Sequence, residues 1–213
     1  MGLQGVGEGV SRARSMKETL KFHYESSGCE LSPFPGFEEL NAGRQELRRL
    51  GLVGVDETGV GFGNVSLRDG DTFYITGSGT GALPALTLQD YAKVVAWDFE
   101  RNWLRCEGRV IASAESLTHA AVYSMDAGVC AVVHGHDRAL WHDLLERGSA
   151  TAVDVPYGTP EMAREVLRFF RETDVRTTKL FAMAGHADGI IAFGRDFREA
   201  LAALARTRAG SNA

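Results

Sequence analysis

Two histidines separated by one residue follow an apolar, β-branched run in the segment AVVHGH. Side chains at positions i and i+2 of a strand share a face, so His134 and His136 would point toward one place. Neutral imidazole is a common ligand for zinc and similar divalent ions, and the pair therefore predicts part of a metal site. Gly135 would face the opposite side and permit close backbone approach. A hydrogen-bonded histidine pair at a strand end remains the simpler alternative for these residues alone.

A third histidine and a carboxylate lie in segments that could join this pair. His186, in FAMAGHADGIIAFG, lies at a glycine-flanked turn and is either a turn residue that caps backbone groups or a third ligand. Glu115 lies on the first turn of a predicted helix, where a carboxylate complements the helix dipole, ligates a metal or acts as general acid/base. Three protein nitrogens plus an open position are typical of a catalytic metal. We read His119 and His142 as ordinary helix residues, with His119 at most supporting a ligand.

Two glycine-rich segments flank a predicted hairpin. GFGNVSLR contains Gly63 and Asn64, and ITGSGTG contains Ser78 and Gly79. Such turns expose successive backbone N–H groups, and hydroxyl groups add donors, an arrangement that suits a phosphate. Glycine-rich turns often only reverse the chain, however. Neither segment continues as a P-loop, and neither opens a helix as a dinucleotide fingerprint does.

Helical and strand patterns alternate along the chain. The spacing of apolar residues predicts helices at 16–26, 37–50, from Thr87 onward, and at 113–125, 138–147, 160–173 and 197–206. It predicts hairpins at 65–76 and within 93–108, and strands at 129–136, 151–155, 179–184 and 189–193. Hairpins mixed with helices predict a single α/β domain with a largely antiparallel sheet covered by helices.

Composition excludes some classes of protein. The net charge of −5 and the lack of a basic stripe argue against a nucleic-acid partner. No segment approaches the roughly 20 apolar residues that cross a bilayer, so we expect no membrane partner. The three cysteines are scattered and odd in number, which favours a reducing, cytoplasmic location. Residues 1–14 read as a disordered extension before a domain at 15–208.

The ordered segments GNVS, ITGSG, SAES..H...Y, VVHGH and GH..G...FG resemble the class II aldolase/adducin family over residues 37–206. The resemblance implies an antiparallel sheet with helices on both sides and a cyclic homotetramer with active sites at subunit contacts. It also implies the roles of the site residues: metal ligation by His134, His136 and His186, ligation or acid/base chemistry by Glu115, and phosphate binding by Gly63, Asn64, Ser78, Gly79 and Ser113. Zinc is the default metal, with Mn, Fe, Co and Ni as alternatives.

The resemblance implies a metal-dependent lyase. Aldolase-type cleavage or formation of a C–C bond, on a small phosphorylated sugar-like hydroxy-carbonyl substrate, would proceed through a metal-stabilised enediolate. Epimerisation, dehydration and decarboxylation are alternatives on the same scaffold. A non-catalytic, adducin-like binding protein is a further alternative, which should lack the ligands that this chain keeps.

The chain departs from the family pattern in three places. Ala114 stands where aldolases have a second serine, and the resulting Ser-Ala-Glu form resembles a dehydratase branch of the family. The stretch between His136 and PYGTPEMA is short and has no counterpart of the tyrosine that donates a proton, although Tyr157 is nearby in sequence. GHADG replaces the usual His-Gly after the third ligand. These differences bear on the reaction and leave the metal ligands in place.

Overall fold

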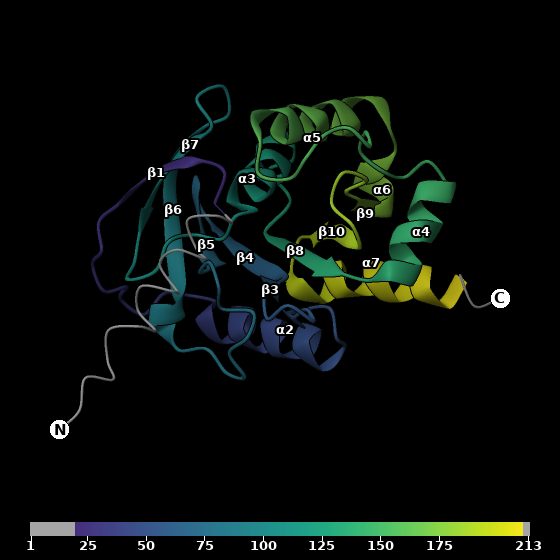
Figure 1. Ribbon diagram of the computed structural model, residues 1–213. Helices are drawn as coiled ribbons and strands as arrows, with labels where there is room; N and C mark the ends of the chain where they lie inside the picture. Colours follow the sequence, from purple (N-terminus) through teal and green to yellow (C-terminus); the bar gives the residue numbers. More distant parts are fainter. Residues whose placement is uncertain (1–19, 211–213) are drawn as a thin grey trace.

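Eight strands form one sheet in the order β1-β7-β6-β5-β4-β8-β10-β9 in a computed structural model that describes residues 20–210 (Figure 1). The strands are β1 (His23–Ser26), β4 (Asn64–Asp69), β5 (Thr72–Thr76), β6 (Tyr91–Asp98), β7 (Trp103–Glu107), β8 (Ala131–His136), β9 (Leu180–Ala182) and β10 (Gly189–Gly194). Neighbours pair antiparallel except β1 and β7, which are parallel. The predicted, mainly antiparallel sheet is confirmed. A short ribbon of β2 (Gly54–Val55) and β3 (Gly61–Phe62) lies apart from it.

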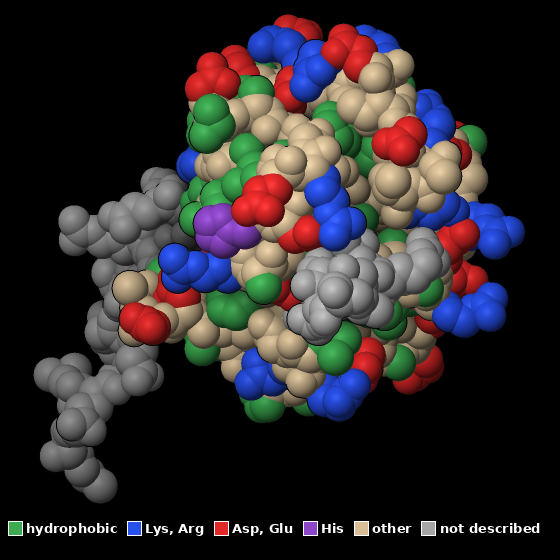
Figure 2. Space-filling view, turned by 90° about the vertical axis from the view of Figure 1, so that its right-hand side faces the viewer, with side chains coloured by type: hydrophobic (Ala, Val, Ile, Leu, Met, Phe, Trp, Pro, Cys, Tyr) green, Lys and Arg blue, Asp and Glu red, His purple; other side chains and the backbone are tan. Residues whose placement is uncertain are grey.

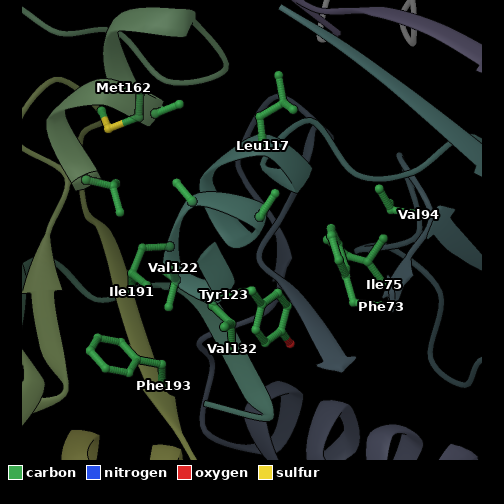
Figure 3. Packing of buried hydrophobic residues seen from close by; sticks show 14 of the residues in the cluster. Phe73, Ile75, Val94, Leu117, Val122, Tyr123, Val132, Met162, Ile191 and Phe193 are labelled. Atoms are coloured by element: carbon green, nitrogen blue, oxygen red, sulfur yellow. The ribbon is translucent and has the colours of Figure 1, made fainter. Parts of the chain in front are cut away.

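Helices cover both faces of the sheet (Figure 1). On one face lie α3 (Ser116–Met125), α5 (Pro160–Glu172) and the single-turn α6 (Val175–Thr178), and on the other lie α2 (Phe37–Arg49), α4 (Arg138–Glu146) and α7 (Phe197–Gly210). Side chains alternate along β8: Val132 packs with the α3 side, whereas Ala131 and Val133 pack with the α2 side. Figure 3 shows the α3-side cluster, where Val132 lies near Val122 and Ile191.

Capping residues fix where two of these helices begin. The Thr159 side chain accepts a hydrogen bond from the Met162 N–H, and Pro160 occupies the first helical turn of α5. Asp137, directly after the histidine strand, accepts from the Leu140 N–H and starts α4. The helix start therefore turns the chain away from the sheet one residue after His136.

The N-terminal helix prediction is wrong for the residues that the structure describes, and its positions 16–19 lie outside them. Residues His23–Ser26 form strand β1, which pairs in parallel with β7 at the sheet edge. All four side chains of β1 are exposed, so backbone hydrogen bonding rather than an amphipathic face decides the conformation. The expected disordered extension at 1–14 also lies outside the described residues.

The helix predicted from Thr87 is only one turn of 3₁₀ helix, Leu88–Asp90, before strand β6 begins at Tyr91. Thr87 and Asp90 do form a reciprocal capping box, so the predicted start is correct and the predicted length is wrong. β6 lies between β5 and β7, and pairing on both sides outweighs the helical spacing of its residues. The strand predicted at 151–155 is also wrong: a single bridge joins Ala150 to Ala182 before the chain turns.

The surface carries mixed charge. On the face shown in Figure 2, acidic and basic side chains are interspersed. Among the described residues, Arg147 pairs with Asp143, and Lys179 pairs with Glu199. Among the described helices, none combines the length and the apolar character needed to cross a membrane.

Candidate metal centre

All nine residues predicted for the site line one cavity of about 210 Å³. They come from the β3–β4 junction, β4, β8, the loop after β5, the turn before α3 and the turn before β10, and are Gly63, Asn64, Ser78, Gly79, Ser113, Glu115, His134, His136 and His186. The fold therefore brings together segments that are up to 123 positions apart in the sequence, from Gly63 to His186.

The first two histidines occupy the end of β8. His134 is buried, whereas His136, at the last strand position, is partly exposed. Gly135 faces the opposite side, as predicted: a Cβ there would lie 3.1 Å from the backbone oxygen of Leu52, just after α2. That oxygen also accepts a hydrogen bond from the His136 N–H at 3.0 Å. Close contact with the segment after α2 thus holds this strand end in place.

His186 reaches the pair from the turn between β9 and β10. The His186 N–H donates to the Met183 carbonyl at 2.9 Å, and the Gly189 N–H donates to the His186 carbonyl at 2.9 Å, which closes the turn. Nε2 of His186 lies 2.8 Å from Nε2 of His136. The alternative that His186 serves only as a backbone cap at this turn is therefore too simple, because its ring points at the strand pair.

The three imidazoles present neutral nitrogens to one point. Their ligand atoms all lie within 4.8 Å of one another. Nδ1 of His134 donates to the Ile190 carbonyl at 3.1 Å, which leaves its Nε2 lone pair for a ligand role. Burial lowers the pKa of all three rings, to about 3 for His186. Neutral, convergent imidazoles are the donor set that zinc and similar divalent ions take, so the residues present fit such an ion.

Glu115 stands beside this group as a buried carboxyl. It is the N-cap residue of α3, one position before the first turn in which the sequence placed it. Its Oε1 lies 3.6 Å from Nδ1 of His186, and its Oε2 accepts a hydrogen bond from Thr118 Oγ1 at 3.0 Å. Burial raises the pKa of Glu115 to about 7, opposed by the Thr118 hydrogen bond and the charge of Lys21. Such a group exchanges a proton near neutral pH.

The glycine-rich segments also line the cavity, and Asn64 pairs with His134 in the β4–β8 ladder. Gly63 and Gly79 have φ values of +77° and +75°, a region that favours glycine. Gly63 has a packing reason as well, since a Cβ would meet Val53 Cγ2 at 2.7 Å. Asn64 is 5% exposed and its Oδ1 has no hydrogen-bond partner among the described residues. A buried amide that lacks a partner at a cavity wall is available to a ligand.

Sequence reasoning missed most of the other residues around the histidines. Tyr157 lines the cavity, and its ring centroid lies 4.3 Å from that of His186. Lys21 places Nζ 3.4 Å from the centroid of the Tyr157 ring. Phe62 stacks on His136 with centroids 4.8 Å apart. The sequence marked Tyr157 only as a nearby tyrosine ahead of a predicted helix, whereas nothing local in the sequence marks Lys21 or Phe62.

A buried polar chain lies beneath the site. Ser66 Oγ lies 2.7 Å from Nδ1 of His119 and 2.7 Å from the hydroxyl of Tyr123. His119 is fully buried, its Nε2 has no hydrogen-bond partner among residues 20–210, and burial lowers its pKa to about 3. It is therefore a neutral core residue of α3, in agreement with the assignment to a helix, and it is packed more deeply than the sequence indicated.

Sequence comparison identifies the class of protein to which this fold and its histidine cluster belong. The class II aldolase and adducin N-terminal domain matches residues 47–208, more than half of the chain. The chain belongs to this family, and the resemblance seen in the sequence is confirmed.

Solved structures share the fold. L-fuculose-1-phosphate aldolase from Thermus thermophilus is 22% identical, with a TM-score of 0.58 over 83% of this chain and 90% of that one. Another L-fuculose 1-phosphate aldolase gives 18% identity and a TM-score of 0.65 over 87% and 86%. A sugar-phosphate aldolase from Thermotoga maritima gives 15% and 0.60 over 82% and 90%. A search of curated protein sequences finds no significant match. At these identities the likeness establishes the fold.

Proposed function

We propose that this chain is a metal-dependent lyase that cleaves or forms a C–C bond in a small, phosphorylated, sugar-like hydroxy-carbonyl substrate. The observation that carries the proposal is the convergence of His134, His136 and His186 within 4.8 Å, in a cavity that also holds a carboxyl of raised pKa. Membership of the class II aldolase family supports an enzyme. The three solved structures named above are called L-fuculose-1-phosphate aldolases or a sugar-phosphate aldolase, which supports this choice of substrate.

A divalent ion held by the three imidazoles, with zinc as our first choice and Mn, Fe, Co or Ni as alternatives, supplies Lewis-acid polarisation of a carbonyl. Glu115 is the group that we assign to proton transfer, because its pKa of about 7 allows both protonation states near neutral pH. The Thr118 hydroxyl fixes one carboxyl oxygen and leaves Oε1 toward His186. The metal content of Glu115→Gln, compared with that of the wild type, tests whether Glu115 also ligates the ion.

The lining residues of the glycine-rich segments, together with Ser113, are assigned to the substrate's phosphate. Ser78 and Ser113 bring hydroxyl groups, and Gly63, Asn64 and Gly79 bring backbone or amide donors to the same cavity. Tyr157 is a second candidate for carrying a proton, since its ring lies against His186 at the cavity wall and burial raises its pKa. We further propose a homotetramer, as the family resemblance implies, and a cytoplasmic location, which the three scattered cysteines favour.

The metal assignment is tested by elemental analysis of protein purified without chelator. We expect about one divalent ion per chain, and its loss in both His134→Ala and His136→Ala. His142→Ala is the matched control, because His142 is an exposed histidine of α4 outside the cavity. Undiminished metal in both site variants would refute the assignment. Turnover of phosphorylated and free ketoses and aldehydes, with defined metal, then identifies the reaction.

Dehydration is the second candidate, and a specific residue favours it. Ala114 lines the cavity between Ser113 and Glu115, at the position where aldolases carry a second serine. The loss of one hydroxyl changes which substrate group that wall can hold. Product analysis separates the two reactions: cleavage gives two carbonyl products, whereas dehydration gives one product that has lost water.

A further inference from the structure

Arg44 of α2 lies buried beneath one of the glycine-rich loops. It is 1% exposed. Its terminal nitrogens donate to four backbone carbonyl oxygens of this loop at 2.6–3.4 Å, those of Thr80, Gly81, Leu83 and Pro84. One turn further along α2, Arg48 donates to the Gly81 carbonyl at 3.1 Å. Two cations of one helix therefore hold a single loop by its carbonyl groups.

The charge of these two arginines is not balanced by a direct partner. Within residues 20–210, neither Arg44 nor Arg48 forms an ion pair, whereas the adjacent Arg49 pairs with Glu46 at 2.7 Å. Burial and the charge of Arg48 lower the pKa of Arg44, and Tyr91 and then Asp90, which also caps Thr87, oppose this shift. A buried charge without a counter-charge is costly, so a positive potential is maintained here against the stability of the fold.

The loop presents its other side to the cavity. In a trans peptide the C=O of one residue and the N–H of the next point in opposite directions, and no described peptide bond is cis. The carbonyls of Thr80 and Gly81 face Arg44, so the N–H groups that follow them point away from it. Ser78, Gly79, Thr80 and Gly81 all line the cavity. A Cβ on Gly79 would meet no atom within 4 Å, so the loop is open to a ligand at this position, whereas a Cβ on Gly81 would meet the Gly54 carbonyl oxygen at 2.5 Å. The N–H groups of Ser78 and Thr80 donate to the Ile111 and Gly77 carbonyls, so those of Gly79 and Gly81 are the backbone donors that this part of the loop can offer to an anion.

We propose that Arg44 and Arg48 are positioning residues that place positive charge on the α2 side of the loop at 77–81. The loop thereby selects a phosphoryl dianion over a carboxylate monoanion. The inference rests on the proposed function, because it assigns the anionic end of that substrate. The arginines do not touch the anion. They act through the peptide groups that they orient and through their charge, which acts across a short, poorly solvated layer of backbone.

Arg48 offers the sharper test, because Arg44→Met would remove four hydrogen bonds of a fully buried side chain at once and put folding itself at risk. Binding of inorganic phosphate is measured by calorimetry on protein purified without chelator, with acetate as the monoanion probe. We expect Arg48→Met to weaken phosphate binding about tenfold, and Arg49→Met to change it less than about twofold. Both variants remove one positive charge from adjacent positions of α2, so the bulk charge of the protein is matched.

A purely structural role for Arg48 is separated by two further measurements. Arg48→Lys should restore most of the phosphate affinity, because it keeps the charge while losing the guanidinium geometry. The loss in Arg48→Met should shrink as salt is raised, since ionic screening weakens charge effects. Equal affinities in Arg48→Met and Arg49→Met, or acetate binding as tight as phosphate binding, would overturn the inference.

The metal content of the same samples distinguishes a failure of the arginine inference from a failure of the proposed function. If phosphate binding follows the arginine prediction but no divalent ion is present, the lyase proposal fails and the anion site stands. If one ion per chain is present and the two methionine variants bind phosphate equally, the arginine inference fails alone. The His134→Ala protein, tested with phosphate, shows whether the anion sits on the loop or on the ion: retained affinity supports the loop, and lost affinity counts against it.

Discussion

Gly189 lies against the ring of His186 so closely that a Cβ there would come within 2.7 Å of the ring's Cδ2. The same glycine pairs with His136 across the β8–β10 ladder. One residue without a side chain therefore borders two of the three histidines. The absence of a Cβ at Gly189 leaves the space that the His186 ring occupies.

Substitution of this glycine should damage the metal site. In Gly189→Ala, the methyl group pushes the His186 ring away from His134 and His136, and we expect the affinity for zinc to fall at least about tenfold, a loss of about 1.4 kcal/mol. Competition with a fluorescent chelator measures it. Gly128→Ala is the control, since a Cβ there meets only the Asp126 side chain, at 3.2 Å. Unchanged zinc affinity in Gly189→Ala would show that the ring has room to move.

Zinc binding should release a proton from Glu115 and not from the histidines. Burial keeps His134 and His186 neutral before metal binds, whereas the pKa of Glu115 is about 7, so its carboxyl is largely protonated at about pH 6.5. A cation nearby favours the carboxylate and expels that proton. Calorimetry at this pH in buffers of different ionisation enthalpy should show release of most of one proton, and much less in Glu115→Gln. Equal release by both proteins would assign the proton elsewhere.

Thr118→Val should raise the pKa of Glu115 further. The Thr118 hydroxyl donates to Oε2 at 3.0 Å and stabilises the charged carboxylate, so its loss favours the protonated form. We expect an upward shift by roughly one pH unit, since a hydrogen bond to a charged group contributes about 1.5 kcal/mol. Carbon-13 NMR of the metal-free protein follows the titration, with Glu115→Gln assigning the signal. A downward shift would contradict the role of this hydroxyl.

His119 should make the metal-free protein sensitive to mild acid. Its pKa is about 3 in the fold against an ordinary value of 6.5, so between these values the unfolded chain binds more protons and stability falls as pH falls. Relative to His119→Asn, the wild type should lose roughly 2 kcal/mol of unfolding free energy from about pH 7 to about pH 5. Urea denaturation at both pH values measures this. If the unfolding free energies of the two proteins depend on pH in the same way, protonation of His119 does not destabilise the fold.

Local sequence signals predicted most of the elements and all of the proposed ligands. The His-x-His spacing works as a predictor because strand geometry alone places His134 and His136 on one face, whatever the rest of the chain does. The errors fall where tertiary pairing outweighs local pattern: β1 depends on the edge of β7, and β6 depends on two neighbours at once. The capping signal at Thr87 is correct, but it carries no information about the strand that begins four residues later.

The surroundings of the site could not be predicted in the same way. Lys21 and Tyr157 meet because distant segments fold over one another, and only the completed structure brings the cation above the ring. The burial of Arg44 likewise depends on where the loop at 77–84 lies relative to α2. Long-range packing of this kind leaves no periodic trace in a single sequence.

The register of β8 against β10 sets His134 opposite Ile191 and His136 opposite Gly189. A slip of one residue would turn both imidazoles to the α2 side of the sheet, away from the third. Binding of the proposed ion would then depend on the correct alignment of two strands that are neighbours in the sheet but distant in the sequence, and a misaligned folding intermediate would lack that stabilisation. Binding of the proposed ion would thus favour the native pairing of β8 and β10 during folding.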